Sequence, residues 1–79
     1  MIFEINEVIE LSKGERYIVA YRLEEKYTWY YYLLKINDDD NVLNDSKIVT
    51  TKRIGEKLYI NEIHDESINE LFRRLKESV

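Results

Sequence analysis

Cysteine and proline are absent from this chain of 79 residues, and glycine and histidine are scarce, at two and one. Without cysteine, neither a disulfide framework nor a zinc finger can hold the fold together. A chain this short buries only about 60% of the surface that its unfolded state exposes, so a small core of aliphatic and aromatic side chains must stabilise it. We expect a single domain over residues 1–79. The sequence also allows a homodimer, because association would enlarge that core.

Long apolar runs are missing as well. The longest stretch without a charged residue, 27–34, is far shorter than the roughly 20 apolar residues that a membrane-spanning helix needs. Residues 1–10 contain three glutamates and no basic residue, whereas an export signal begins with positive charge. The sequence therefore predicts a cytoplasmic protein that has no membrane partner.

Positive charge is in deficit, because 12 basic residues face 16 acidic ones and the net charge is −4. A surface of this overall sign repels phosphate groups, which counts against nucleic-acid binding. The charges are nevertheless unevenly distributed. Asp38, Asp39 and Asp40 lie in a segment without a base, whereas residues 47–57 contain four basic residues and one acid.

Aromatic residues are abundant between Tyr27 and Tyr32, where five of the ten in the chain occupy six consecutive positions. Aromatic side chains suit a pleated surface, and successive residues of a strand point to opposite faces of a sheet. Strict alternation places on one face Thr28, Tyr30, Tyr32, Leu34 and Ile36. It places on the other face Trp29, Tyr31, Leu33 and Lys35. Because both faces carry bulky groups, one face can form core while the other contacts a partner.

Short apolar runs separated by polar turns indicate a meander of strands. We expect a surface loop over residues 37–45 among five strands, which span 8–11, 16–23, 28–36, 46–54 and 57–63. The core face of the second strand is expected to carry Tyr17, Val19, Tyr21 and Leu23. Gly55 and Glu56 predict a type II′ hairpin turn, since glycine readily adopts the positive φ of its first position.

From Asp65 onward the apolar period changes from two to about 3.6 residues. One stripe at helical spacing is formed by Ile68, Leu71, Phe72 and Leu75. Asp65 is the expected N-cap, with His64 as the alternative, and basic residues near the end suit the negative end of the helix dipole. The sequence therefore predicts one helix at the C-terminal end.

Five short strands followed by a helix predict an α+β fold, either a small twisted antiparallel sheet or an open SH3-like barrel. The segments that carry a resemblance are 7–11 (EVIEL), 17–19 (YIV), 30–34 (YYYLL) and 59–68 (YINEIHDESI). The order of these segments resembles that in a group of small acidic bacterial proteins of unknown function. The resemblance implies a strand-rich body and a terminal helix, and it assigns no catalytic residue.

Catalytic and metal-binding motifs were tested against the spacing that each chemistry needs. His64 and Ser67 stand three residues apart, but a hydroxyl nucleophile also needs an orienting acid and an oxyanion hole, and capping explains both residues better. A calcium loop that begins at Asp38 would place Val42 and Val49 at ligand positions. We therefore expect no enzymatic activity, no metal and no cofactor.

Two functions remain after these exclusions. If Trp29 and Tyr31 are exposed rather than core, they form a partner-binding patch flanked by Arg22 and Lys35, as aromatic rings do at protein interfaces. The protein is then an interaction module that docks on a larger protein. One form of it is an inhibitor that presents Asp38, Asp39, Asp40 and the glutamates of residues 1–10 in place of nucleic-acid phosphates.

The alternative is a small barrel that binds nucleic acid. In it Trp29 and Tyr31 stack on bases, and the phosphate contacts come from Lys52, Arg53 and Lys57. The negative net charge favours the interaction module over this alternative.

Overall fold

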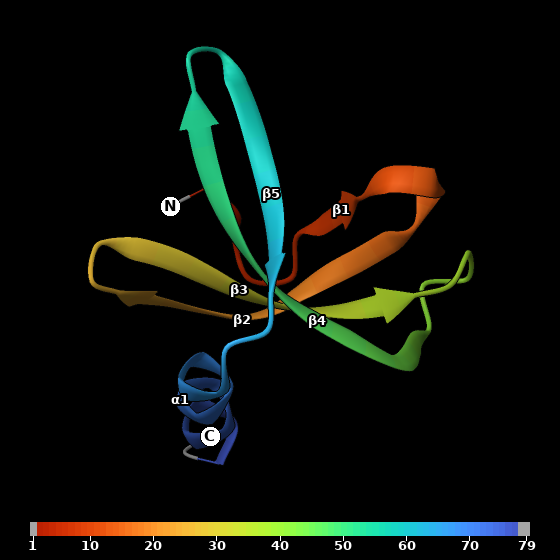
Figure 1. The fold of residues 1–79 in the computed structure, drawn as a ribbon. Helices are drawn as coiled ribbons and strands as arrows, with labels where there is room; N and C mark the ends of the chain where they lie inside the picture. Colours follow the sequence, from red (N-terminus) through yellow and green to blue (C-terminus); the bar gives the residue numbers. More distant parts are fainter. Residues whose placement is uncertain (1, 78–79) are drawn as a thin grey trace.

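The computed structural model describes residues 2–77, and Figure 1 shows an antiparallel sheet followed by one helix. The strands are neighbours in chain order: β1 Val8–Glu10, β2 Arg16–Glu25, β3 Thr28–Ile36, β4 Val42–Ile54 and β5 Lys57–Ile63. A short 3-10 turn, η1 (Ser12–Gly14), joins β1 to β2, and the helix α1 spans Glu66–Glu77. The sheet curls into a half-barrel, which confirms the predicted α+β fold of five strands and a C-terminal helix.

In the view of Figure 1 the strands overlap near the centre of the molecule, and the hairpins diverge from that region. Two irregularities in strand pairing contribute to this curl. The register of β2 against β3 shifts between Val19 and Tyr21, and that of β3 against β4 shifts between Leu34 and Ile36. An extra residue in one strand bends it and increases the right-handed twist, so the sheet cannot stay flat.

The irregularity in β2 also changes which side chains share a face. Tyr17 and Val19 are buried in one hydrophobic cluster, whereas Tyr21 and Leu23 pack in another. The expectation of a single core face along this strand is therefore wrong, because the residue inserted at Ala20 interrupts the alternation.

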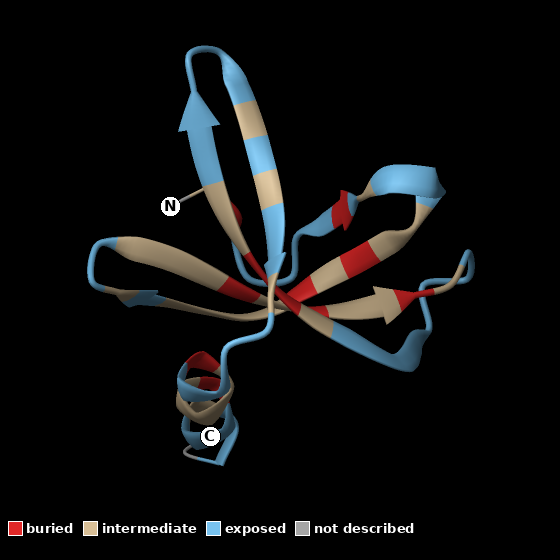
Figure 2. Ribbon diagram, in the orientation of Figure 1, coloured by how far each residue is buried: buried red, intermediate tan, exposed pale blue. Residues whose placement is uncertain are grey.

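Burial is concentrated toward the centre of the sheet and on one side of α1, while the ends of the hairpins are mostly exposed (Figure 2). The first core lies on one face of the sheet and contains Phe3, Ile9, Tyr17, Val19, Tyr31, Leu33 and Val49. The second lies under α1 and contains Ile48, Ile68 and Phe72, with Tyr32 and Leu71 among the partly buried side chains packed on it. Because the apolar side chains are divided between two faces, neither core is large.

Strand β4 begins earlier than the sequence indicates, at Val42, so the predicted loop over residues 37–45 is too long. The loop itself is short because the Asn37 side-chain oxygen accepts the backbone N–H groups of Asp39 and Asn41, at 2.9 and 3.0 Å. Val42 is 57% exposed, and its neighbours up to Ser46 are also exposed. The first residues of β4 therefore lack the apolar alternation that reveals a half-buried strand.

The two-residue turns of the sheet have different origins. Between β4 and β5, Gly55 has a φ of +63° and Glu56 has no positive φ, which agrees with the predicted type II′ turn. Between β2 and β3, Lys26 and Tyr27 both occupy the left-handed region, with φ of +51° and +66°. That pair has the φ pattern of a type I′ turn, which usually contains asparagine and glycine.

Helix α1 begins at the predicted cap. The Asp65 carboxylate accepts the backbone N–H of Ser67 at 2.9 Å and that of Ile68 at 3.4 Å, so Asp65 and not His64 is the N-cap. The hydroxyl of Ser67 donates to the same oxygen, and this bond, together with the two backbone bonds, lowers the pKa of Asp65. Within residues 2–77, no helix is long and apolar enough to cross a membrane.

Candidate functional site

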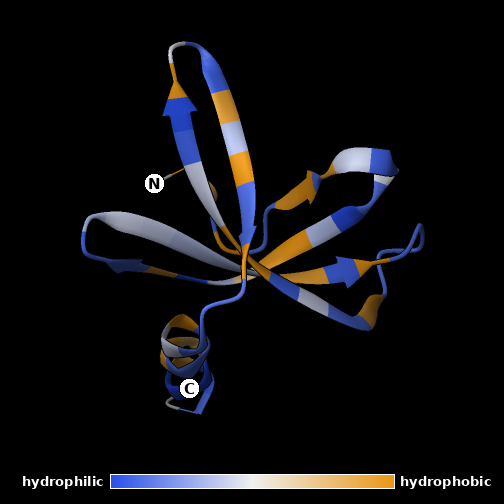
Figure 3. Ribbon diagram, viewed as in Figure 1, coloured by the Kyte–Doolittle hydropathy of each residue, from blue (hydrophilic) through white to orange (hydrophobic). Residues whose placement is uncertain are grey.

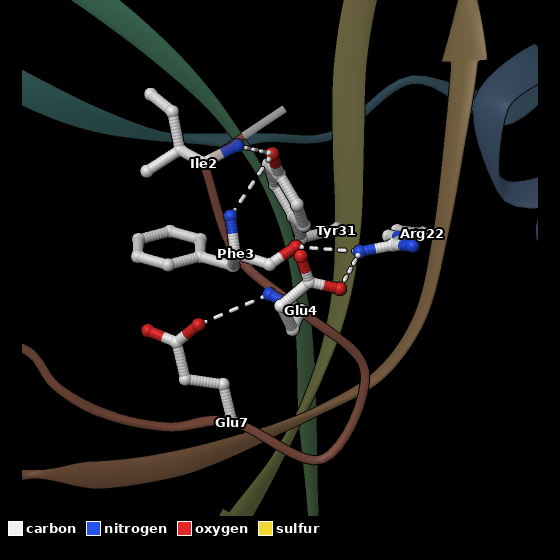
Figure 4. A network of polar contacts seen from close by, with 6 residues as sticks. All are labelled: Ile2, Phe3, Glu4, Glu7, Arg22 and Tyr31. Carbon is white, nitrogen blue, oxygen red and sulfur yellow. Dashed lines mark hydrogen bonds and ion pairs between the residues drawn. The ribbon is translucent and has the colours of Figure 1, made fainter.

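Tyr31 is completely buried and belongs to the first core. Its hydroxyl oxygen accepts the backbone N–H of Ile2 at 2.9 Å and that of Phe3 at 3.4 Å, and its ring meets the Phe3 ring edge-on, with centroids 5.1 Å apart (Figure 4). The expectation that Tyr31 lies on an exposed docking face is therefore wrong. Ile2 and Phe3 of the N-terminal segment cover it, and no packing role was predicted for that segment.

Trp29 is half-buried against the same core, and Arg22 lies beside it, with the guanidinium carbon 5.9 Å from the ring centroid. The Arg22 Nη1 donates to the Phe3 carbonyl at 3.1 Å and to the Glu4 carboxylate at 2.7 Å, so the N-terminal segment also holds this side chain (Figure 4). Trp29 and Arg22, two of the four predicted docking residues, thus lie together. The hydrogen bonds of Arg22, however, are made to other groups of the same chain.

Lys35 lies toward the other end of β3, opposite Tyr17, and it is ion-paired with Glu15 at 3.1 Å. The hydrogen bond and the opposite charge raise the pKa of Lys35 and lower the pKa of Glu15. The structure therefore separates Lys35 from the Arg22 and Trp29 pair.

The acidic residues Asp38, Asp39 and Asp40 are exposed in the loop between β3 and β4. Asp40 forms an ion pair with Arg16 at 2.8 Å, and Glu4 forms one with Arg22 at 2.7 Å. An arginine thus neutralises a carboxylate in each of the two acidic segments proposed to imitate phosphates.

The basic residues Lys52, Arg53 and Lys57 are exposed near the end of the β4–β5 hairpin. Lys52 is directly opposite Tyr59, which is 44% exposed, and Lys57 is opposite Ile54. Arg53 pairs with Leu58 and faces the other side of the hairpin. Tyr59 was not among the predicted contact residues, although its place two residues after Lys57 indicates that both share a face of the strand.

A groove lies between the first and last strands of the half-barrel, with a volume of about 380 Å³. Its apolar walls are Leu11 after β1, Val49 in β4, and Leu58 and Ile60 in β5. Figure 3 shows apolar residues interrupted by more polar ones along β5. Leu58 and Ile60 are two positions apart, so both side chains point to the same face of the strand. The charged residues of this groove are Glu10, Glu15, Lys47 and Glu62.

One side of this groove is an open strand edge. Within residues 2–77, β5 is paired with β4 alone, and its backbone makes no other hydrogen bond to the chain. An edge strand presents a row of N–H and C=O groups that another strand can bind. The opposite wall is short, because β1 has three residues before the Leu11 N–H bonds to the Glu15 carbonyl at 2.7 Å and closes the η1 turn.

Lys47 is held in place where β4 borders the groove. Its ammonium lies 4.9 Å from the centroid of the Tyr17 ring and 3.5 Å from the Glu62 carboxylate. The interaction with the Tyr17 hydroxyl, followed by the charge of Glu62, raises the pKa of Lys47. This cation is therefore already matched by groups of the protein.

A second hollow, of about 470 Å³, lies between the sheet and α1 and carries charges of both signs. The Tyr32 hydroxyl accepts from the Lys76 ammonium at 3.1 Å there, and hydrogen bonds to Ser46 and then Lys76 lower the pKa of Tyr32. His64 Nε2 lies 3.6 Å from Glu62, and the Ser67 hydroxyl donates to Asp65. His64 and Ser67 are thus engaged with separate acids and do not form a nucleophile pair.

Comparison with known proteins finds no relative of this chain. No family model matches the chain, and neither the curated proteins nor the solved structures contain a match. The resemblance drawn from the sequence therefore holds only as a small strand-rich protein with a C-terminal helix.

Proposed function

We propose that this chain is a non-enzymatic interaction module that binds a larger protein through the groove between β1 and β5. The observation that carries this proposal is the open edge of β5 beside apolar walls. An extended segment of a partner can add to such an edge as a further strand, with backbone hydrogen bonds giving affinity and side-chain pockets giving specificity.

The edge of β5 has little of the protection that natural edge strands usually carry. Short length, proline, bulges and inward-pointing charges all discourage pairing with another chain. β5 is seven residues long, has no proline, and pairs with β4 in continuous register. Of its residues that face the groove, Leu58 and Ile60 are apolar, and only Glu62 is charged. An edge left this open suits a binding role.

Phosphate mimicry is a weaker form of the interaction hypothesis. It needs a row of uncompensated carboxylates, but Asp40 is paired with Arg16 and Glu4 with Arg22. Tyr31 contributes nothing to a docking surface because it is buried. The proposal therefore rests on the strand edge rather than on the acidic loop or the aromatic face.

Nucleic-acid binding is the second candidate, and one observation favours it. Tyr59 and Lys52 are directly opposite each other on the exposed end of the β4–β5 hairpin, so a stacking ring and a cation share a face. Trp29 and Tyr31 are not needed in this version. The net charge of −4 still opposes it.

The test compares two lysine substitutions at adjacent positions of β5. Ile60→Lys puts a charge into the groove, whereas Asn61→Lys puts the same charge on the opposite face of the strand. Each purified variant, checked for the wild-type circular dichroism spectrum, captures partners from a lysate of the source cell. We expect the wild type and Asn61→Lys to retain one protein that Ile60→Lys loses.

Retention of the same protein by Ile60→Lys would contradict the proposal. Should Ile60→Lys fail to fold, Leu58→Lys tests the same wall nearer the end of the hairpin. A nuclease-sensitive eluate that all three variants yield, and that Lys52→Glu loses, would instead support the nucleic-acid candidate.

A further inference from the structure

Resting on the proposed function, we infer that the groove takes an extended basic segment in which apolar residues alternate with lysine or arginine. The occupant is a strand of a partner protein.

The period of β5 sets the pattern of the occupant. Leu58, Ile60 and Glu62 line the groove at every second position, so their spacing along the strand is about 6.8 Å. A strand added to the open edge has the same period, and its alternate side chains lie over this face. The two apolar residues of β5, with Leu11 and Val49, therefore select apolar side chains at alternate positions of the occupant.

The charges of the groove set the sign of the occupant. Three of its four charged side chains are carboxylates. Lys35 matches Glu15, and Lys47 matches Glu62. The exposed residue Glu10 has no ion pair within residues 2–77. It borders the groove and is directly opposite Arg16 in the β1–β2 register, so its side chain points to the outer face of the sheet, away from Ile9 and Tyr17. When the apolar side chains of the occupant face the groove, its lysine or arginine side chains point to this outer face and can pair with Glu10. The net charge of −4 would speed the approach of such a segment.

A second copy of this chain fits the groove less well. Antiparallel pairing of β5 with its own copy would bring a second Glu62 toward a rim that already carries excess carboxylates. Both copies would also carry the same net charge of −4. A strand of opposite charge avoids both repulsions.

The experiment titrates labelled protein with two amidated heptapeptides, followed by the amide shifts of an NMR spectrum. In the first peptide lysine and valine alternate, and in the second glutamate replaces every lysine. We expect the lysine peptide to shift the amides of residues 57–63 and 8–12, and to bind on the order of tenfold more tightly than the glutamate peptide at low salt.

Charge-reversed variants localise the effect. Glu10→Lys should weaken binding of the lysine peptide by about fivefold, because it removes the unpaired carboxylate. Glu24→Lys is the matched control, since it makes the same charge change at an exposed residue of β2 outside the groove. We expect Glu24→Lys to change the affinity by less than about twofold.

Several results would overturn the inference. They are equal binding of the glutamate peptide, equal weakening by both variants, and shifts of residues 57–63 that depend on protein concentration without peptide, which would indicate a second copy. If neither peptide binds, and Ile60→Lys still fails to capture the protein that the wild type retains, the inference fails and the proposed function stands. If Ile60→Lys keeps that protein, the proposed function fails whatever the peptides do.

Discussion

The Tyr31 hydroxyl joins β3 to the N-terminal segment by accepting two backbone N–H groups, those of Ile2 and Phe3 (Figure 4). Tyr31→Phe keeps the ring and its contact with Phe3 but removes this acceptor. A buried donor that loses its partner costs about 1 to 3 kcal/mol, so we expect the free energy of unfolding to fall by about 1.5 kcal/mol. Urea unfolding followed by circular dichroism measures the change.

Tyr27→Phe is the matched control, because the Tyr27 side chain is 98% exposed. The same loss of a hydroxyl should change the free energy of unfolding there by less than about 0.5 kcal/mol. Equal urea midpoints for Tyr31→Phe and the wild type would show that the N-terminal segment does not depend on this bond.

At the scale of single residues, alternation along the aromatic strand was readable but burial was not. Trp29, Tyr31 and Leu33 do share a face, as the period of two predicts. Whether that face is covered depends on Phe3, which lies about 28 positions away in the chain and has no local signal of a core residue. The predicted docking patch failed at Tyr31 for this reason.

At the scale of elements, the β2–β3 turn is strained by the residues it contains. Lys26 and Tyr27 both have positive φ, which is unfavourable for residues with a Cβ atom. Replacing them with asparagine and glycine, the usual pair of a type I′ turn, should raise the free energy of unfolding by about 1 kcal/mol. The measurement is thermal unfolding of Lys26→Asn with Tyr27→Gly. The reversed order, Lys26→Gly with Tyr27→Asn, is the control and should stabilise less. A lowered melting temperature for both would contradict the strain argument.

Helix α1 depends on its apolar side chains for contact with the sheet. Phe72 is 1% exposed, and its ring centroid lies 5.6 Å from that of Tyr32. Phe72→Ala should lower the free energy of unfolding by about 3 kcal/mol, and helical circular dichroism should fall, because a helix of 12 residues is marginal alone in water.

Arg73→Ala provides the comparison for this helix. Arg73 is exposed and its ion pair with Glu70 lies on the surface, so the expected change is within about 0.5 kcal/mol. An Arg73→Ala variant as unstable as Phe72→Ala would mean that the helix is held by charge rather than by packing.

The elements that the sequence predicted well are those whose signals are local. Asp65 and the apolar stripe identify α1, and Gly55 identifies the β4–β5 turn. The bulge at Ala20 and the early start of β4 have no such signal, because each depends on pairing with a neighbouring strand. Local periodicity predicts the elements, while pairing sets their irregularities.

At the scale of the whole molecule, the curl of the sheet creates the candidate site. An open barrel was among the predicted folds, and the alternation of Leu58, Ile60 and Glu62 was readable. The groove was not predictable, because it requires Leu11 and Ile60 to face each other across the sheet. Their meeting results from the twist accumulated over all five strands.

At the same scale, we expect two carboxyl groups to contribute to the response of the molecule to acid. The hydrogen bond and charge of Lys35 lower the pKa of Glu15, and the Ser67 hydroxyl and two backbone N–H groups lower the pKa of Asp65. A lowered pKa in the folded state stabilises the fold fully above the ordinary values of 4.5 and 3.8. This stabilisation is lost as the pH falls through the lowered values.

We therefore expect the urea midpoint to stay level near neutral pH and to decrease once the pH is below about 4.5, because protonation breaks the ion pair between Glu15 and Lys35 and weakens the helix cap. The variant with Glu15→Gln and Asp65→Asn should have a lower midpoint at neutral pH and a shallower fall in acid. Glu24→Gln removes an exposed carboxylate that has no ion pair within residues 2–77, so its profile should follow the wild type. If the double variant loses stability in acid as steeply as the wild type, these two groups do not control acid unfolding, and the cause lies in the other carboxylates.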